Sequence, residues 1–199
     1  KFNGLKIDFE ENSHEMAKCT DIDFVIKSPG ISDDLEIVDF YRNNGIKVIS
    51  EIEFAFNFSK SKIIGITGSN GKTTTTTLVH KLISDANISC SISGNIGNSF
   101  SKVCEDSVQY STVELSSFQL DGVEKFRPHI AILTGISPDH LDRYKNYNAY
   151  IEAKFKITKN QSENDYLIYN SDCDETNKYI KTNNINSIFI LLEIFTNLQ

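Results

Sequence analysis

The sequence has 199 residues, enough for one domain of ordinary size or one and a half small ones. Hydrophobic residues make up 39% of the chain and aromatic residues 11%, which is typical of a globular protein and argues against a disordered one. The formal net charge of −7 argues against non-specific nucleic-acid binding, so any anion site must be a local positive pocket or use metal ions.

A strand, a helix and a second strand are predicted before residue 50. The first strand ends at the turn signal Ser28-Pro29-Gly30, and Gly45 follows the end of the helix. This order predicts a right-handed parallel crossover. A connector is expected next, with a domain boundary near residue 59. The ranges are 23–27 for the first strand, 33–44 for the helix, 46–49 for the second strand and 51–60 for the connector.

Strands and helices then alternate along the rest of the chain. Strands are predicted at 62–66, 88–92, 110–115, 130–133 and 166–169, and helices at 73–85 and 148–159. The pattern predicts an α/β fold with a mainly parallel sheet and flanking helices. We expect a partial Rossmann-like N-terminal domain at residues 1–58 and an incomplete P-loop-type central domain at 59–199. Ligands of such sheets bind beyond the carboxyl ends of the strands.

A glycine-rich loop, T-G-S-N-G-K-T at residues 67–73, joins a strand to the helix after it. Gly68 and Gly71 allow the backbone to turn tightly and approach a polyphosphate, and the free N–H groups of the helix start favour anions. Lys72 is placed to contact the β- and γ-phosphates of a nucleotide, and the Thr73 hydroxyl to bind Mg²⁺. The loop therefore predicts an enzyme that handles ATP.

Two features qualify this interpretation in opposite directions. Ile66 stands where the pattern G-x-x-x-x-G-K-[ST] has its first glycine, so the match is one residue short. Five consecutive threonines at 73–77 open the helix despite their poor helix propensity, which stability alone does not explain. A glycine-rich turn with a solvated lysine is the alternative, and we favour phosphate binding over it.

Glu114 closes an apolar strand and opens the string E-L-S-S-F-Q-L at residues 114–120. A carboxylate has no packing role there, but beside a triphosphate it would hold Mg²⁺ directly or through water. The alternative is a strand-end acid that caps the following turn. Asn95, between Gly94 and Gly97, also follows a strand, and its chemistry alone is equally compatible with a simple turn.

The string S-P-D-H-L-D-R-Y at residues 137–144 follows another strand. His140 is its candidate ligand for a second metal or a substrate phosphate, although an exposed loop histidine explains it as well. Lys154 lies in a predicted helix, where lysines are usually solvated. No comparable surroundings point to a role for the remaining histidines, His14, His80 and His129.

The cysteines predict neither a zinc site nor a disulfide framework, because they are widely spaced and contain no C-x-x-C pair. They are Cys19, Cys90, Cys104 and Cys173. We expect reduced, mostly buried thiols in a cytoplasmic protein. No apolar run approaches the roughly 18 residues of a membrane span. The first residues show neither an initiator Met nor a signal peptide, so we expect a chain entered partway through a longer protein.

In their order and spacing, these motifs resemble the Mur ligases, the ATP-dependent amide-forming enzymes of peptidoglycan precursor synthesis. The similarity covers roughly residues 20–172 and is strongest to the branch that adds D-glutamate to UDP-N-acetylmuramoyl-L-alanine. It implies that a substrate carboxylate is activated as an acyl phosphate, which the amine of D-glutamate then attacks. It also implies a cytoplasmic monomer with small-molecule substrates and without nucleic-acid or membrane partners.

The resemblance also implies roles for individual residues. The ATP phosphates would be bound by Gly68, Ser69, Asn70, Gly71, Lys72, Thr73 and Thr74. Thr73 and Glu114 would hold one Mg²⁺, and His140 would hold a second. Lys154 matches a carbamylated lysine, an anionic partner of that second metal. Lys72, Glu114, His140 and Lys154 would form the catalytic set, and Asn95 and Ser116 would contact the UDP-sugar.

The chain departs from the family pattern at several places. Gly135 stands where these ligases usually have an Asn. The N-terminal glycine loop for uridine diphosphate and the C-terminal domain for D-glutamate are expected to be absent, so we expect an inactive fragment. After residue 172 the similarity fades into an apolar run at 188–195. A folylpolyglutamate synthetase and a non-catalytic nucleotide-binding module remain as alternatives.

Overall fold

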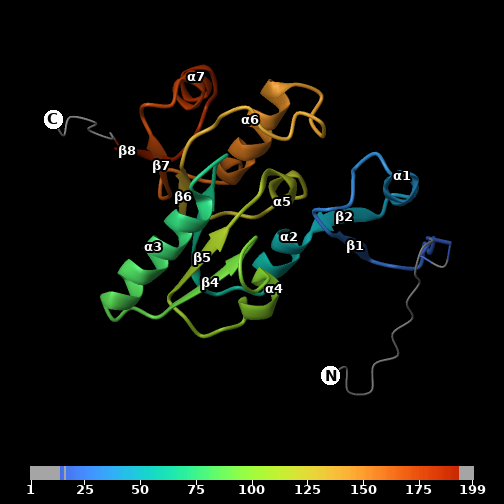
Figure 1. The fold of residues 1–199 in the computed structure, drawn as a ribbon. Coiled ribbons are helices and arrows are strands. Elements are labelled where there is room, and N and C mark those ends of the chain that lie inside the picture. The colour runs from blue at the N-terminus through green and yellow to red at the C-terminus, as the bar shows by residue number, and fades with distance from the viewer. Residues whose placement is uncertain (1–13, 16, 193–199) are drawn as a thin grey trace.

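The computed structural model describes residues 14–15 and 17–192, and it shows the predicted α/β architecture (Figure 1). Residues 1–4, and residues 193–195 of the predicted apolar run, lie outside the described residues. The elements form a two-stranded sheet, β1-β2, and a six-stranded sheet of order β4-β5-β3-β6-β7-β8. Every strand pair in the described part of the chain is parallel.

The predicted N-terminal crossover is present as β1 (Phe24–Lys27), α1 (Glu36–Asn43) and β2 (Lys47–Ser50), here called the N-terminal unit. Its two strands are parallel, as expected. The helix begins at Glu36, later than the predicted start at residue 33, because residues 33–34 form a turn. A small core forms between helix and strands from Ile37, Val38, Tyr41 and Ile46.

The connector predicted at 51–60 is wrong for its first half, which is the helix α2 (Glu51–Phe56). Ser50 caps this helix by accepting a hydrogen bond from the backbone N–H of Glu53 at 3.2 Å. Ile52 and Ala55 are fully buried and pack in the core of the large sheet. A helix of six residues is weakly stable alone, and the burial of this apolar pair against the large sheet stabilises it.

The large sheet contains the strands predicted for it and one more. Its members are β3 (Lys62–Thr67), β4 (Cys90–Gly94), β5 (Tyr110–Glu114), β6 (Ile130–Leu133), β7 (Tyr166–Asn170) and β8 (Ile188–Leu192). The strand β8 accounts for most of the apolar run at 188–195. It forms the edge of the sheet, and all five of its side chains are exposed.

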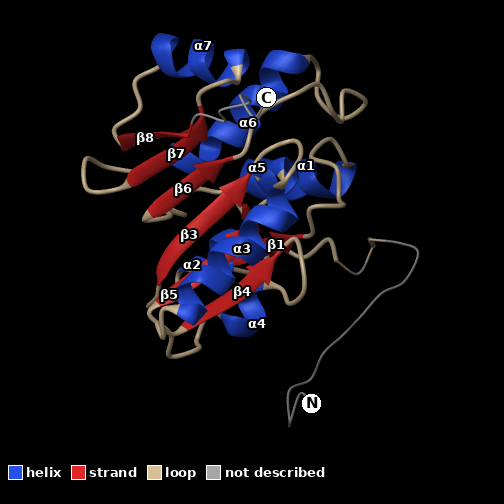
Figure 2. Ribbon diagram, turned by 60° about the vertical axis from the view of Figure 1, so that its left-hand side comes forward, coloured by secondary structure: helices blue, strands red, loops and turns tan. Residues whose placement is uncertain are grey.

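Helices cover the two faces of this sheet unequally. The helix α3 (Lys72–Asp85) packs on one face, over an apolar cluster that includes Ile64, Ile66 and Ile132 (Figure 2). The opposite face packs against the larger core, to which α2, α5 and α6 contribute. The remaining helices are α4 (Phe100–Val103), α5 (Ser117–Asp121), α6 (Tyr147–Phe155) with a 3-10 turn at Lys156–Thr158, and α7 (Asp174–Thr182).

The strand register brings three loops together at one edge of the sheet. Ile66 of β3 pairs with Glu114 of β5, and Gly94 of β4 pairs with the same Glu114. Thr67 pairs with Leu133 of β6 on the other side. Because all these strands run in one direction, the segments that follow them emerge side by side at their carboxyl ends. The predicted site residues follow these strand ends, apart from Lys154 in α6.

Candidate active site

The glycine-rich loop lies between β3 and α3, as the sequence predicts. Gly68 has a φ of +150°, and a Cβ on it would lie 1.9 Å from Oγ1 of Thr134. Gly71 has a φ of +78° and precedes the first residue of α3. Both positions therefore require glycine. Ile66, where the pattern has its first glycine, is fully buried within β3, so this departure strengthens the core and leaves the loop's turn intact.

Lys72 bends back over the loop that precedes it. Its Nζ donates hydrogen bonds to the carbonyl oxygens of Gly68 at 3.0 Å and Ser69 at 2.9 Å. The amine is therefore held at the mouth of the loop, beside the first N–H groups of α3. A cation at a helix N-terminus in this position favours a bound anion.

Thr73 and Glu114 are brought into direct contact, although 41 residues separate them in the sequence. The Thr73 hydroxyl donates to Oε2 of Glu114 at 2.8 Å, and the Asn95 amide donates to Oε1 at 2.9 Å. Gly94 makes this approach possible, since a Cβ there would lie 2.2 Å from the Glu114 carbonyl oxygen. One carboxylate thus joins three of the predicted site residues.

The surroundings of Glu114 fit a divalent cation. Glu114 is 1% exposed, and both of its hydrogen-bond partners are neutral groups. A buried carboxylate is costly unless a positive charge compensates it, and hydroxyl and carboxylate oxygens are the ligands that Mg²⁺ prefers. Within the described residues, no group of three or more His, Cys, Asp or Glu side chains could hold a metal. A metal here would also need hydroxyl, water or substrate oxygens.

Lys154 of α6 reaches the same loop. It is 2% exposed, and its Nζ donates to the carbonyl oxygen of Gly68 at 2.8 Å. The amine lies 4.5 Å from the ring centroid of Tyr150. Burial, reinforced by the nearby positive charge of Lys72, lowers the pKa of Lys154 from 10.5 to about 7. The expectation of a solvated helical lysine, drawn from chemistry alone, is therefore wrong.

His140 lies in the loop between β6 and α6, with its side chain half exposed. Its ring packs 5.0 Å from the ring of Phe118 and 6.4 Å from that of Tyr150. The imidazole and the amine of Lys154 therefore both lie near the ring of Tyr150. His140 is not hydrogen-bonded to any other predicted site residue of the described chain, so the structure places it beside the cluster around Glu114 and not within it.

Ser116 has a structural partner of its own. It caps α5, accepting from the N–H of Gln119 at 3.2 Å, while its own backbone N–H donates to Oε1 of Gln119 at 2.9 Å. This reciprocal pair is a capping box. The pattern S-x-x-Q at 116–119 signals it in the sequence. Its role in substrate contact stays a prediction.

Sequence reasoning missed several residues that support the loop. Oγ of Ser69 lies 3.0 Å from the Tyr150 hydroxyl and accepts from the backbone N–H of Ser137 at 3.0 Å. Thr134 donates its hydroxyl to the carbonyl oxygen of Asn70 at 2.6 Å. These contacts join residues that are 64 to 81 positions apart, so no local pattern reveals them.

A cavity of about 360 Å³ borders the loop on the side of β7. Its lining includes Ser69, Asn70, Thr134, Asn170, Asp172 and Cys173. Residues 170–173 follow the end of a parallel strand, which is the one signal that could have indicated them. Gly135, where the family resemblance leads us to expect an Asn, also lines this cavity. Gly135 has a φ of +141°, a conformation that favours glycine, so an Asn would be strained in this backbone.

An all-parallel sheet, a glycine-rich loop before a helix and a carboxylate at the next strand end define an α/β domain of the P-loop type. The model of the Mur ligase middle domain matches residues 66–194. The chain belongs to the Mur ligase family. No helix among the described residues is long and apolar enough to cross a membrane.

Three curated relatives that share one name are similar to this chain in sequence. A UDP-N-acetylmuramoylalanine–D-glutamate ligase from Christiangramia forsetii is 49% identical over 185 residues, covering 92% of this chain and 42% of the relative. Relatives of that name from Bacteroides fragilis and Fusobacterium nucleatum are 45% and 43% identical, covering 85% and 80% of this chain and 39% and 38% of their own lengths. The chain thus spans about two fifths of the relatives it matches.

Solved structures of other family members have a similar fold. A UDP-N-acetylmuramoyl-L-alanyl-D-glutamate–2,6-diaminopimelate ligase has a TM-score of 0.58 at 20% identity, covering 88% of this chain and 49% of that one. A MurF ligase from Thermotoga maritima in complex with ADP has a TM-score of 0.57 at 17% identity, covering 79% and 44%. At these identities the similarity shows the fold alone.

Proposed function

We propose that this chain is the ATP-handling part of an enzyme that adds D-glutamate to UDP-N-acetylmuramoyl-L-alanine in peptidoglycan precursor synthesis. The observation that supports it most directly is the carboxylate of Glu114, buried at a strand end and bonded to Thr73 of the phosphate loop and to Asn95. The name shared by relatives at 43 to 49% identity supports the choice of substrates.

In this proposal the reaction begins with transfer of the γ-phosphoryl group of ATP to the substrate carboxylate. A carboxylate oxygen forms the new P–O bond, ADP leaves, and the amine of D-glutamate then attacks the acyl phosphate. Phosphate departs, the amide bond forms, and the amine loses a proton. Two anions must meet in the first step, so positive charge at the loop is its main requirement.

The loop residues Gly68 to Thr74 are proposed to hold the ATP phosphates. Lys72 would exchange its two carbonyl partners for phosphate oxygens, which a charged amine binds more strongly. Thr73 and Glu114 would hold one Mg²⁺, which supplies charge neutralisation between the two reacting anions. Asn95 and Ser116 would contact the UDP-sugar, in addition to the hydrogen bonds that they make in the structure.

Lys154 is proposed to act as a carbamate. A lysine attacks the carbon of CO₂ only as the neutral amine, with formation of an N–C bond and loss of a proton. The lowered pKa of Lys154, about 7, makes the neutral form abundant near neutral pH. The resulting anion would pair with the second Mg²⁺ proposed for His140, and both side chains lie near the ring of Tyr150.

We further propose that residues 1–58 contribute to UDP-substrate binding and that 59–199 form the ATP-binding portion, in a cytoplasmic monomer. The relatives are more than twice as long as the matched segment. The complete reaction then needs the parts of the relatives that this chain does not span. For the chain alone we expect weak Mg-nucleotide binding by calorimetry and no turnover, with binding lost in Lys72→Ala. Tight ADP binding would contradict this expectation.

A chimera tests the reaction itself. Residues 20–172 would replace the matching segment of the Christiangramia forsetii relative, followed by an assay of phosphate release. We expect release that needs ATP, UDP-N-acetylmuramoyl-L-alanine and D-glutamate together and that is abolished by Lys72→Ala. Turnover that ignores the UDP-sugar or prefers a folate would overturn the proposal. Nucleotide binding without turnover would favour a non-catalytic module instead.

A further inference from the structure

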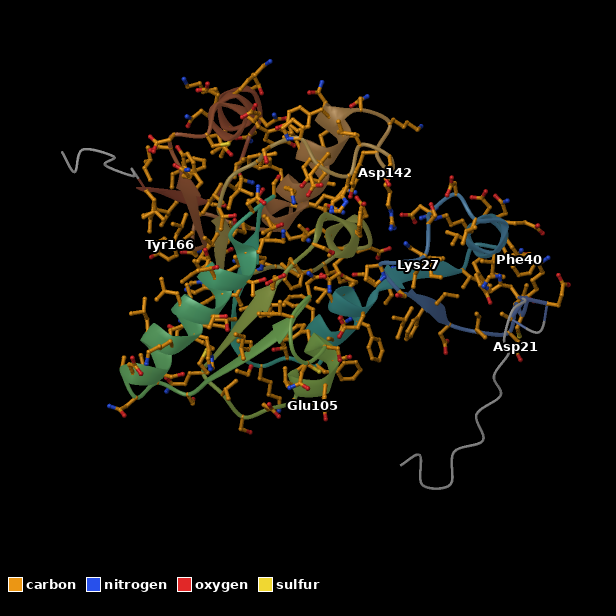
Figure 3. All side chains as sticks on the ribbon, in the orientation of Figure 1. Asp21, Lys27, Phe40, Glu105, Asp142 and Tyr166 are labelled. Carbon is orange, nitrogen blue, oxygen red and sulfur yellow. The ribbon has the colours of Figure 1, made fainter. Side chains whose placement is uncertain are left out.

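Arg143 lies where three segments of the chain meet. Its guanidinium carbon is 3.9 Å from the ring centroid of Phe118 in α5. Its Nη2 donates to the carbonyl oxygen of Ile31, in the loop between β1 and α1, at 3.1 Å. Figure 3 labels Lys27 and Asp142, which mark the N-terminal unit and the loop that contains Arg143. One side chain thus joins the N-terminal unit to two segments of the large domain.

Arg143 is linked to His140 through its backbone and through its side chain. Its backbone N–H donates to the carbonyl oxygen of His140 at 3.1 Å, which closes the turn between them. Its side chain covers the ring of Phe118, which in turn lies 5.0 Å from the imidazole. Arg143 therefore contacts both the backbone of His140 and the aromatic ring that packs against its side chain.

His140 needs such support because its own conformation is unfavourable. Its φ of +51° lies in the left-handed region, which residues other than glycine seldom adopt. The side chain is 48% exposed, so burial does little to fix the ring. A strained residue keeps its conformation only where its neighbours hold it there. These neighbours are Phe118 and Arg143, together with Asp139, whose Oδ2 lies 3.5 Å from Nε2 of the imidazole and whose Oδ1 accepts from the His140 backbone N–H at 2.9 Å.

The Ile31 carbonyl oxygen, which accepts from Arg143, is itself held in place by a second hydrogen bond. This oxygen also accepts from Nζ of Lys27 at 2.7 Å, and the side chain of Lys27 is only 9% exposed. Lys27 further pairs with Asp33 at 3.6 Å. Movement of the N-terminal unit away from the large domain would break the bond from Arg143 to Ile31, and the contact with Phe118 would then hold the guanidinium without it.

We propose that Arg143 is a positioning residue that orients His140 and makes this orientation depend on the docked N-terminal unit. The proposal deepens the proposed function, in which His140 is a metal ligand. A lysine at this position can place its charge over the ring of Phe118. It cannot at the same time stack on the ring and hydrogen-bond to Ile31, as the planar guanidinium can. A methionine keeps only the length.

Proton NMR of the histidine rings provides the test, because the chain has only four histidines. The ring-proton signal that is absent in His140→Gln is assigned to His140. Phe118→Leu then gives the chemical shift of this signal without the neighbouring aromatic ring. We expect Arg143→Met to move the His140 signal most of the way to that position, and Arg143→Lys to move it partway. Arg42→Lys is the matched control, since Arg42 contacts Asp33 within the N-terminal unit, through the Asp33 carboxylate at 2.6 Å and its carbonyl oxygen at 3.1 Å.

His129 reports on the rest of the fold, because its ring packs against Asp165 and Tyr166. A His140 signal unchanged in Arg143→Met would overturn the proposal. Joint displacement of the His140 and His129 signals would also overturn it, since that shows a general structural role.

Metal binding gives a second readout. Titration with Mn²⁺ in the presence of ATP should broaden the His140 signal in the parent chain. In Arg143→Met we expect the same broadening to need about tenfold more Mn²⁺. Loss of a group that orients a metal ligand typically lowers metal affinity about 10- to 100-fold, and tenfold is the smaller of these values. Absence of broadening in the parent chain would contradict the proposed metal role of His140, whereas the ring-signal comparison alone decides the role of Arg143.

Discussion

The Thr73 hydroxyl donates a 2.8 Å hydrogen bond to Oε2 of Glu114, which joins the first turn of α3 to the carboxyl end of β5. This bond brings a phosphate-loop hydroxyl and a buried carboxylate, the two groups proposed to hold Mg²⁺, to one point.

Glu114→Gln should separate the metal contribution from the nucleotide contribution to binding. The amide can still bond to Thr73 and Asn95, so the fold should persist, but it has no negative charge for Mg²⁺. We expect Mg-ADP affinity to fall about tenfold or more, and ADP affinity in EDTA to stay unchanged, both by calorimetry. Exposed Glu105, changed to Gln, is the control. An equal loss with and without Mg²⁺ would argue against a metal role.

Gly94→Ala and Gly97→Ala form a matched pair at the end of β4. Both glycines have positive φ, +106° and +62°, but a Cβ on Gly94 would collide with the Glu114 carbonyl oxygen, whereas Gly97 faces open space. Gly97→Ala should lower the free energy of unfolding by about 1–2 kcal/mol, and Gly94→Ala by about 3 kcal/mol or more. Urea denaturation measures both. Equal losses would show that the backbone contact with Glu114 is unimportant.

The sequence sufficed where a local pattern and the structure agree. The strand at 62–67, its glycine loop and the helix after it were predictable because burial, turn and helix start follow one another along the chain. The short helices α2 and α5 were not predicted, although S-x-x-E at 50–53 and S-x-x-Q at 116–119 are capping signals. Five or six residues are too few for a helical pattern.

The site divides in the same way. Position at or after the end of a parallel strand indicated that Glu114 lies beside the phosphate loop, and the structure also brings Asn95 to the same carboxylate. The burial of Lys154 could not be predicted, because residues far away in the sequence enclose it and its bond to Gly68 spans 86 positions. Nor could the link from Arg143 to Ile31, which spans 112 positions.

Lys154 should make stability depend on pH. Its pKa in the folded chain, about 7, lies below its usual 10.5, so between these values the folded state binds fewer protons than the unfolded one. The free energy of unfolding should therefore rise with pH from about 7 to 10.5, by at most about 1.4 kcal/mol per unit from this group. Denaturation in CO₂-free buffer measures it. Lys154→Met should flatten the rise, and parallel profiles for both proteins would contradict the lowered pKa.

Glu53 should contribute strongly to stability from a position outside the site. It is 3% exposed, and its carboxylate accepts 2.9 Å hydrogen bonds from the backbone N–H groups of Glu124, Lys125 and Phe126. It thereby fixes α2 to the segment between α5 and β6. Bonds to a charged acceptor are about twice as strong as neutral ones, and a Gln at this position would place a donor against N–H groups that are also donors.

We expect Glu53→Gln to lower the free energy of unfolding by about 2–4 kcal/mol in urea denaturation at neutral pH. Glu124→Gln is the control on the same segment. Its carboxylate is 45% exposed and forms a surface pair with Lys47 at 3.0 Å, so its loss should change stability by no more than about 1 kcal/mol. Similar small losses in both variants would mean that water replaces the carboxylate of Glu53. In that case the attachment of α2 would rest on the apolar contacts of Ile52 and Ala55 alone.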